Sequence, residues 1–439
     1  MLINKSVIIA GCLLMMGQVV ASPDIQHWQT KNGSDVYFVP SNDIPMVDVR
    51  IVFDAGSARD AEMGKDLSGT ALMTNGLLSE GAAGDDAQVL AEKFEAVGAS
   101  FGNGSLKDMA WLSVRSLRED KYLQPALINL KNILSLPTFS KASFSRELER
   151  LKISVKAGKQ SPSTIASLRF YSELYGDHPY ALPSEGTEES LKKLKLSHLK
   201  EFYKKYYVAK NAVISIVGQL TKAEAEKIAT DLVADLPSGI KAKKLPAVKP
   251  LTESKTIHID FPSRQSSVMM GQVGMARGDA DYYALYLANH AFGGSGFGSR
   301  LMQEVREDRG LAYSVYSYFS PMHVQGPFMI GLKTRNDQLD EAMGIVHAEL
   351  KKYITQGPDS DELADSLKNI TGGFPLRIDS NKKIVEYLSV IGFYDLPLDY
   401  LDTFVSSVNL QNKKKVDDAL QRRIHPDKML TVIVGAKSE

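Results

Sequence analysis

Residues 292–319 read FGGSGFGSRLMQEVREDRGLAYSVYSYF, and four of the first seven residues are glycine. A loop so rich in glycine is similar to the loops that bind phosphate groups. It lacks the Gly-Lys-Ser/Thr end of a P-loop, however, and an expected helix precedes it where a dinucleotide fingerprint requires a strand. Considered alone, the start of this stretch therefore indicates a turn between two helices rather than a nucleotide site.

The stretch lies in the second of two halves that resemble each other. Segments of the first half recur in the same order in the second at nearly equal spacing: Gly218 follows Ala58 by 160 residues, and Gly435 follows Ala276 by 159. Matching order and matching spacing favour an internal duplication. The paired segments are VRIVFDAGSARD (49–60) with SVMMGQVGMARGD (267–279), LKNILSLPTFSKASF (130–144) with LKKYITQGPDSDEL (350–363), and NAVISIVGQL (211–220) with KMLTVIVGAK (428–437).

Local patterns in the first half predict a mixture of antiparallel strands and helices. Residues 25–40, IQHWQTKNGSDVYFVP, have the pattern of a hairpin whose turn is at Asn32-Gly33. Residues 111–117 alternate as a strand does, and stripes of apolar residues at helical spacing follow over 123–134 and 144–155. Because the helices are grouped beside hairpins, without regular β-α-β alternation, we expect an α+β fold.

A segment rich in proline and lysine separates the two halves. DLPSGIKAKKLPAVKPLTESK, residues 235–255, has few large apolar residues, which is typical of an interdomain linker. A chain of 439 residues is also longer than one hydrophobic core usually accommodates, so two domains of roughly 200 residues each are expected. We predict a first domain over residues 22–236, a linker over 237–252 and a second domain over 253–439.

The first 21 residues have the pattern of a bacterial export signal. Lys5 supplies the positive charge, an apolar run follows, and a small-residue cleavage site ends at Ala21. The alternative is a lipoprotein signal, in which Cys12 becomes the lipidated N-terminus. We expect simple cleavage and a periplasmic protein, because the apolar run continues beyond Cys12. Since Cys12 is the only cysteine, the cleaved chain has neither a disulfide nor a thiolate metal site.

Composition excludes several classes of function. Lys+Arg and Asp+Glu both number 52, so the net charge gives no electrostatic reason to expect binding to nucleic acid or to an anionic membrane. A hydrophobic share of 44% with 24% charged residues is typical of a globular protein. The apolar run near the N-terminus is too short to predict a membrane span.

The histidines do not form a recognisable metal motif. No two of the eight lie within five residues of each other, so a helical His-x-x-x-His pair is absent. The nearest approach is HLKEF, residues 198–202, where His198 and Glu201 are followed by Phe202 instead of a second histidine. A Gly-x-Ser-x-Gly elbow is absent as well, so no serine nucleophile is assigned.

Two stretches resemble a known family. The run 299–319, with the glycines before it, closely resembles the second-domain signature of the insulinase/pitrilysin family of metallopeptidases, which includes the mitochondrial processing peptidase. Residues 178–218 resemble the end of the first domain in that family. The resemblance covers essentially the whole mature chain. It implies two homologous α+β domains, each a mainly antiparallel sheet with helices packed on it.

In that family, a helix of the first domain carries His-x-x-Glu-His. The histidines bind zinc, and the glutamate is the general base for a zinc-bound water. LMTNG takes this place here: Leu72 and Gly76 stand where the histidines would be, and Asn75 stands where the glutamate would be. A glutamate on a later helix completes the family's site, and the matching positions, 153–155, contain no acid. The resemblance thus implies a degenerate site without a catalytic residue or metal ligand.

The second domain retains a pair that the family uses to hold substrate. Arg306 and Tyr313 match the arginine and tyrosine that reach the catalytic centre and bind the substrate backbone near the scissile bond. Arginine offers a rigid fork of donors, and a tyrosine hydroxyl can stabilise a developing oxyanion. The alternative is that Arg306 forms a surface ion pair and Tyr313 only packs on its strand. Arg309 is a second candidate for the arginine, although the spacing favours Arg306.

The resemblance implies a non-catalytic, substrate-binding subunit of a heteromeric zinc peptidase. A homologous partner subunit with the intact motif would hold the zinc, and this chain would bind no cofactor. Two such chains would enclose a chamber in which short, unfolded peptides add as an extra strand to a sheet edge. The alternative, from a different class, is a peptide-binding or structural assembly protein of the same fold with no role in proteolysis.

Overall fold

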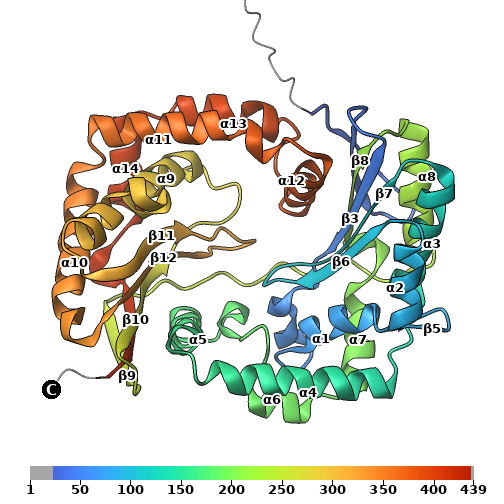
Figure 1. Cartoon of the computed structure of the whole chain (residues 1–439), viewed down its shortest axis with the longest axis horizontal. Helices are drawn as coiled ribbons and strands as arrows, with labels where there is room; N and C mark the ends of the chain where they lie inside the picture. The colour runs from blue at the N-terminus through green and yellow to red at the C-terminus, as the bar shows by residue number, and fades with distance from the viewer. Residues whose placement is uncertain (1–22, 437–439) are drawn as a thin grey trace, which may run out of the picture.

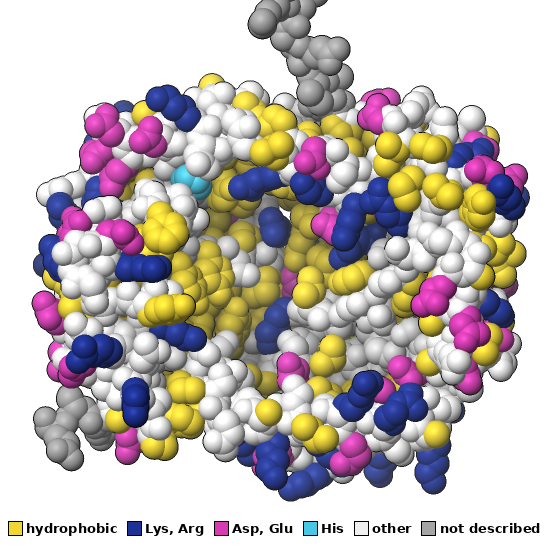
Figure 2. All heavy atoms as spheres, viewed as in Figure 1, with side chains coloured by type: hydrophobic (Ala, Val, Ile, Leu, Met, Phe, Trp, Pro, Cys, Tyr) yellow, Lys and Arg dark blue, Asp and Glu magenta, His cyan; other side chains and the backbone are white. Residues whose placement is uncertain are grey.

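The computed structural model describes residues 23–436. The predicted signal peptide, 1–21, and the alternative lipidation site, Cys12, lie outside these residues. The described chain forms two halves that face each other across a hollow (Figures 1 and 2). Within 23–436, no helix has the length and apolar character that a membrane span requires.

Strands in the described residues form a six-stranded sheet, a five-stranded sheet and a small two-stranded one. The six-stranded sheet has the order β1-β2-β8-β3-β7-β6, and the five-stranded sheet has the order β9-β13-β10-β12-β11. The strands are β1 Gln26–Gln29, β2 Asp35–Pro40, β3 Met46–Phe53, β4 Gly81–Ala82, β5 Asp85–Asp86, β6 Ser100–Ser105, β7 Ala110–Leu117, β8 Ala212–Gly218, β9 Lys255–Asp260, β10 Gln265–Val273, β11 Ala312–Phe319, β12 Pro327–Arg335 and β13 Leu430–Gly435.

The helices follow the same plan in both halves. In each half the longest helix comes after an antiparallel hairpin: Lys141–Gly158 after β6 and β7, and Leu339–Gln356 after β11 and β12. The α-helices are α1 Thr70–Leu78, α2 Ala87–Glu95, α3 Asp120–Ser135, α4 Lys141–Gly158, α5 Pro162–Tyr175, α6 Glu188–Lys193, α7 Leu196–Tyr206, α8 Lys222–Val233, α9 Tyr282–Asn289, α10 Leu339–Gln356, α11 Ser360–Gly373, α12 Asn381–Phe393, α13 Tyr400–Asn409 and α14 Lys413–Arg423. Short helical turns include η2 Pro179–Ala181, η4 His290–Gly294 and η6 Met302–Glu307.

Both large sheets have the same topology. The sequence β2-β8-β3-β7-β6 in the first corresponds strand for strand to β9-β13-β10-β12-β11 in the second. In each sheet the first pair of this series is parallel and the other pairs are antiparallel. This agreement confirms the predicted fold class, two homologous α+β domains. The hairpin predicted at Asn32-Gly33 is also confirmed, because β1 and β2 pair antiparallel across it.

The two halves exchange a helix. Helix α12 of the second half packs on β8, β3 and β2, whereas α5 of the first half packs on β13 and β10 (Figure 1). The α12 contact is close: a Cβ at Gly392 would lie 2.4 Å from the ring of Tyr37, and Ser389 donates a hydrogen bond to Ser215 (3.1 Å). On the other sheet, Phe170 of α5 packs within 3.1 Å of such a Cβ at Gly271. Each sheet therefore buries part of its inner face against a helix of the other half.

A buried carboxylate also joins the halves. Asp108, on the turn between β6 and β7, accepts hydrogen bonds from the hydroxyls of Tyr180 (2.5 Å) and Tyr394 (3.0 Å) and from the backbone N–H of His323 (2.8 Å). Tyr394 and His323 belong to the second half. Burial raises the pKa of the Tyr394 hydroxyl, which keeps it a proton donor. Because the carboxylate is fully bonded, its burial is compensated and the halves are held in one arrangement.

Candidate functional site

Helix α1 contains LMTNG and begins at a buried carboxylate. Asp60 accepts hydrogen bonds from the backbone N–H groups of Gly69 and Ala71, both at 2.8 Å. These bonds satisfy donors that a helix start leaves free. Gly69 has a φ of 95°, a conformation that glycine adopts without strain. Burial raises the pKa of Asp60 to about 7, against the effect of the two hydrogen bonds. The chain itself thus fixes the position of LMTNG.

Leu72 and Gly76 face a recess between α1 and α4. Its volume is about 390 Å³, and a Cβ at Gly76 would meet no atom within 4 Å. Of the positions expected to carry the fourth residue, 153–155, Ser154 lines the recess, whereas Ile153 is 69% exposed and does not line it. The lining residues are Leu72, Met73, Gly76 and Leu77 of α1 and Glu147, Arg150, Leu151 and Ser154 of α4.

Asn75 points away from this recess. It is buried, and its Nδ2 donates to the backbone oxygen of Trp111 (3.3 Å) and to the hydroxyl of Tyr207 (3.2 Å). Its own backbone oxygen accepts a hydrogen bond from Nδ2 of Asn103 on β6 (2.9 Å). An amide with these bonds connects α1 to β7 and α7, and it has no basic lone pair for proton abstraction. The residue is therefore structural.

The donor set at the recess does not fit a zinc ion. Zinc in proteins takes imidazole, thiolate and carboxylate ligands in a tetrahedral arrangement. The recess offers a single carboxylate, Glu147, and the guanidinium groups of Arg146 and Arg150 each lie 3.1 Å from it. Across residues 23–436, no group of three His, Cys, Asp or Glu side chains has a geometry that could hold a metal. The residues present at LMTNG and α4 thus cannot support metal-assisted hydrolysis.

Arg306 and Tyr313 lie together in the second half. The Arg306 guanidinium carbon is 5.9 Å from the ring centre of Tyr313, a distance typical of a cation–π contact. The strand β11 shifts register between Ala312 and Ser314, so Tyr313 is the extra residue of a β-bulge. Bulges often redirect a side chain next to a functional site. Here the bulge leaves Tyr313 71% exposed.

The arginine has no strong partner among the described residues. Its nearest acid is Glu307, whose Oε1 lies 3.7 Å from Nε of Arg306, beyond hydrogen-bond distance. By contrast, Arg309 is engaged, because Nη1 donates to the carboxylate (2.6 Å) and the backbone oxygen (2.5 Å) of Glu304. The guanidinium of Arg306 is therefore available to a ligand, whereas that of Arg309 is not.

Sequence reasoning missed aromatic residues near this pair. The ring of Phe297 lies 5.3 Å from the guanidinium carbon of Arg306 and is exposed. Tyr316 and Tyr318 of β11 are exposed as well. One signal was present in the sequence: a phenylalanine between glycines and three tyrosines within six residues are unusual for a solvent-facing loop and edge strand.

The two sheets end in edge strands of different character. Among the described residues, β6 makes no backbone hydrogen bond beyond its ladder with β7, so its outer edge is open. The outer edge of β11 is covered at Ser317, because Nδ2 of Asn289 donates to the backbone oxygen of Ser317 (3.1 Å) and the Ser317 hydroxyl donates back to Asn289 (2.8 Å). A peptide strand would thus find free backbone groups along β6, whereas Asn289 interrupts the edge of β11.

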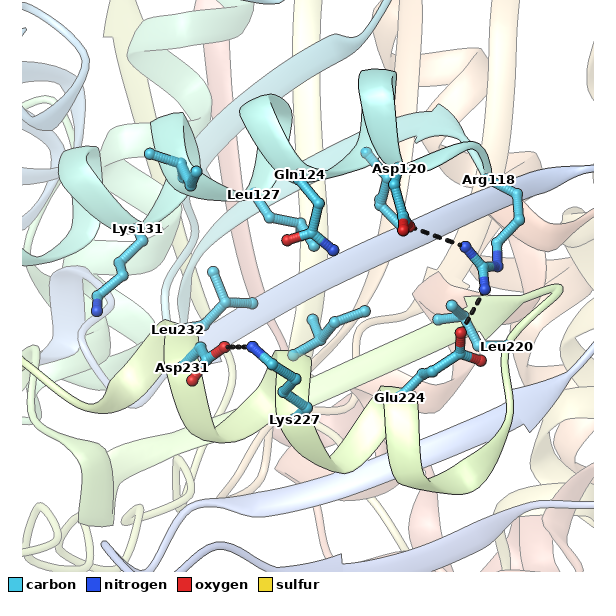
Figure 3. A pocket seen from close by; sticks show the side chains of 13 residues that line it. Arg118, Asp120, Gln124, Leu127, Lys131, Leu220, Glu224, Lys227, Asp231 and Leu232 are labelled. Atoms are coloured by element: carbon cyan, nitrogen blue, oxygen red, sulfur yellow. Dashed lines mark hydrogen bonds and ion pairs between the residues drawn. The ribbon is translucent and has the colours of Figure 1, made fainter.

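A separate groove lies between α3 and α8 on the other side of the first sheet (Figure 3). Its volume is about 410 Å³, and its floor is formed by leucine and isoleucine side chains. Charged groups at the rim pair with one another, as in Lys227 with Asp231 and Arg118 with Asp120 and Glu224. Because the charged groups that line it are already paired, the groove offers no free charge for a ligand and is not the candidate site.

Comparison with known proteins agrees with these features. Residues 37–188 match the family Insulinase (Peptidase family M16), and residues 193–370 match Peptidase M16 inactive domain. The chain is similar to the peptidase M16 inactive domain from Pseudomonas fluorescens, whose crystal structure superposes with a TM-score of 0.91 at 40% identity and covers 94% of this chain and 98% of that one.

Two curated bacterial proteins match nearly the whole chain. The uncharacterized zinc protease YmxG of Bacillus subtilis is 25% identical over 416 residues, 93% of this chain and 98% of that protein. The non-peptidase homolog YmxG of Helicobacter pylori is 24% identical over 407 residues, 90% of each. Since one is described as a protease and the other as a non-peptidase, the residues of this chain decide between the two descriptions.

Proposed function

Because the chain belongs to the insulinase family, peptidase family M16, and has no ligands at its zinc positions, we propose that it is the non-catalytic, substrate-binding subunit of an exported, heteromeric zinc peptidase. A homologous subunit with the intact His-x-x-Glu-His motif is the proposed partner. The substrates are short, unfolded peptides. The predicted signal sequence supports a periplasmic location, with lipidation at Cys12 as the alternative.

One observation carries the proposal. The zinc-binding part of the family's site has no metal ligands in this chain, whereas the substrate-binding part still has its two residues. At LMTNG, apolar packing and an engaged amide replace the metal ligands and the base. In the second half, Arg306 and Tyr313 remain adjacent without a strong partner among the described residues; Tyr313 is exposed and Arg306 is half-buried. This arginine–tyrosine pair beside the bulge of β11 supports a role in peptide binding.

The pair has the chemistry that a substrate clamp needs. The Arg306 guanidinium presents several donors in a rigid fork and suits the carbonyl oxygens of a peptide backbone. A tyrosine hydroxyl such as that of Tyr313 can donate to the oxygen that becomes negative during amide hydrolysis. The partner's zinc would supply the activated water. The open edge of β6 supports the proposal that this chain also holds extended peptide by strand addition.

Affinity capture tests the proposed complex. The tagged full-length chain is expressed in the bacterium that encodes it, and proteins that co-purify from the periplasm are identified by mass spectrometry. We expect a homologous chain that carries His-x-x-Glu-His, in near-stoichiometric amount, with zinc in the complex. Capture of only proteins without a zinc motif would favour the alternative, a structural assembly protein with no role in proteolysis.

A further inference from the structure

Two tyrosines form a platform on one face of the second sheet. The rings of Tyr316 and Tyr318 are stacked, with centres 5.9 Å apart and planes 21° from parallel. They are 45% and 38% exposed, which is high for large rings on a sheet. In the register of β11 with β12, Tyr316 lies opposite Gly331 and Tyr318 opposite Met329. The platform thus spans both strands.

This platform faces the hollow between the halves. The Tyr318 hydroxyl lies 3.9 Å from the sulfur of Met329, and Met329 packs in one cluster with Phe170 of α5. The platform therefore shares the sheet face on which α5 lies. Since α5 packs chiefly on β13 and β10, this face is left uncovered at β12 and β11. Figure 2 shows hydrophobic side chains gathered on the wall of the hollow over these strands.

A glycine provides the space in which the platform rests. A Cβ at position 331 would lie 2.4 Å from Cζ of Tyr316, so any larger residue would push the ring away. The Tyr316 ring thus lies over Gly331, and Tyr316 is 45% exposed. A partly exposed aromatic ring can accept another ring by offset stacking, which contributes about 0.5–1.5 kcal/mol beyond area burial.

A lysine without an ion-pair partner in residues 23–436 lies on the same face. Lys333 is exposed and pairs in register with Ser314, two residues before Tyr316. Residues two apart on a strand share a face, so Lys333, Tyr316 and Tyr318 follow one another along it. The next cation on that face, Arg335, pairs with Asp337. Lys333 is therefore the cation of this strip that is free to bind an anionic group.

We propose that the strip formed by Lys333, Tyr316 and Tyr318 binds extended peptides with the pattern acid-x-aromatic-x-aromatic. The acidic side chain pairs with Lys333, and the two aromatic side chains stack on the tyrosines. Alternate side chains of an extended peptide are about 6.8 Å apart, close to the spacing of the two rings. The peptide binds through its side chains, because Asn289 interrupts the edge of β11. This inference rests on the proposed function, since it assigns a peptide class to the same chamber.

Peptide binding to the purified full chain tests the strip. The probe is fluorescein-labelled Ser-Asp-Ser-Phe-Ser-Phe-Ser, compared by anisotropy with versions that carry Ala for both Phe, or Lys for Asp. We expect the first peptide to bind most tightly. Tyr316→Ala and Tyr318→Ala should each weaken its binding about 5-fold and reduce the preference for Phe over Ala by the same factor, because the other ring still stacks. Lys333→Glu should reverse the preference between Asp and Lys.

Matched controls lie on the surface of the second half. Leu410→Ala removes an exposed apolar side chain and Lys414→Glu reverses an exposed charge, and both should leave the affinities unchanged. If Tyr316→Ala fails to fold, Tyr316→Leu still covers Gly331 and removes only the stacking. Equal affinities for the Phe and Ala peptides would overturn the proposal. If the wild-type chain self-associates and Tyr316→Ala does not, the proposal is also overturned, because the strip would then be a contact between copies of this chain.

Failure of this inference is distinguishable from failure of the proposed function. If the tyrosine variants no longer bind the Phe peptide tightly, and no zinc-bearing partner is found, the peptide-binding strip is supported and the peptidase role is refuted. If a two-chain peptidase is reconstituted and Tyr316→Ala leaves its kcat/KM ratio for Phe over Ala peptides unchanged, the peptidase role is supported and the strip is refuted.

Discussion

At the scale of single residues, the former metal site has been converted into packing. Gly76 removes a ligand position altogether, and Leu72 fills part of the recess with apolar surface. Asn75 retains a polar side chain, but its hydrogen bonds to Trp111 and Tyr207 use it to attach α1 to the sheet. These substitutions explain why the helix survives without a metal.

Substitution of the Arg306–Tyr313 pair should lower the rate of the two-chain enzyme without breaking its assembly. Arg306 is half-buried and Tyr313 is exposed, and both are bonded weakly or not at all, so Arg306→Ala and Tyr313→Phe should fold normally. Loss of one donor to a developing oxyanion costs about 100-fold in kcat. Peptide cleavage by the mixed chains measures this. Arg309→Ala is the control, since Arg309 is bound to Glu304; wild-type rates in both test variants would assign the pair to surface packing.

Asp48 gives the chain a pH-dependent stability. Burial raises its pKa to about 6, while Arg115 and Lys382 act in the opposite direction and Glu386 adds to the rise. One carboxylate oxygen is buried without a hydrogen bond. Because the folded state holds the proton more tightly than the unfolded state, ionisation costs stability as pH rises from about 4 to about 6.

Asp48→Asn should remove that cost. The difference in the free energy of unfolding between variant and wild type should grow in favour of Asn as pH rises from 4 to 7, by at most about 3 kcal/mol. Urea denaturation of both proteins at several pH values in this range gives the difference directly. A difference that is constant with pH would show that Asp48 ionises normally in the folded chain.

At the scale of elements, the exchange of α5 and α12 organises the molecule. A Cβ at Gly392 would lie 2.4 Å from Tyr37 and 2.6 Å from Val213, so α12 approaches the first sheet closely only because this residue is glycine. Gly344, in helix α10, has no atom within 4 Å of a Cβ. The same substitution should therefore have opposite effects at the two positions.

Gly392→Ala should destabilise the protein by about 1–3 kcal/mol through overpacking. Gly344→Ala should stabilise it by about 0.4–1 kcal/mol, because alanine reduces the entropy of the unfolded chain and the helix accepts it without strain. Urea denaturation of both variants measures the two shifts. If Gly392→Ala were as stable as Gly344→Ala, α12 would not be in close contact with the first sheet.

The sequence was sufficient to predict the elements but not their partners. Repeated segments around Ala58 and Ala276 predicted the duplication, and the alternation after Ala110 predicted β7; both are confirmed. The helix exchange was not predictable, because an apolar stripe shows that a helix is buried and does not show against which sheet. The platform of Tyr316 and Tyr318 was missed for a similar reason. The alternation of side chains along a strand shows that the two tyrosines share a face of the sheet, but it does not show whether α5 covers that face.

At the scale of the whole molecule, the helix exchange makes the two halves depend on each other. Residues 23–236 expressed alone would leave the inner face of the first sheet without α12, and residues 253–436 alone would lack α5. Each half would expose a large apolar surface. We expect both fragments to aggregate singly and to form a soluble complex when co-expressed, as checked by size-exclusion chromatography. A soluble, monomeric fragment with cooperative unfolding would contradict this.

The hollow between the halves sets what the molecule can bind. Arginine and lysine side chains surround it in Figure 2, together with the hydrophobic wall over β11 and β12. Folded proteins would be excluded by the fixed arrangement of the halves, which Asp108 secures with two hydrogen bonds across them, from Tyr394 and from the backbone N–H of His323. Extended peptides are therefore the substrates that we propose for this chain.

The central claim is that this chain contributes substrate binding and a partner contributes the zinc. Cleavage of a quenched fluorescent peptide by the purified chain, by a zinc-motif homologue from the same bacterium, and by their mixture measures it most directly. The account predicts no cleavage and no stoichiometric zinc for this chain alone, and chelator-sensitive cleavage that is fast only in the mixture. Chelator-sensitive cleavage by this chain alone, or a partner that is equally fast without it, would contradict the claim.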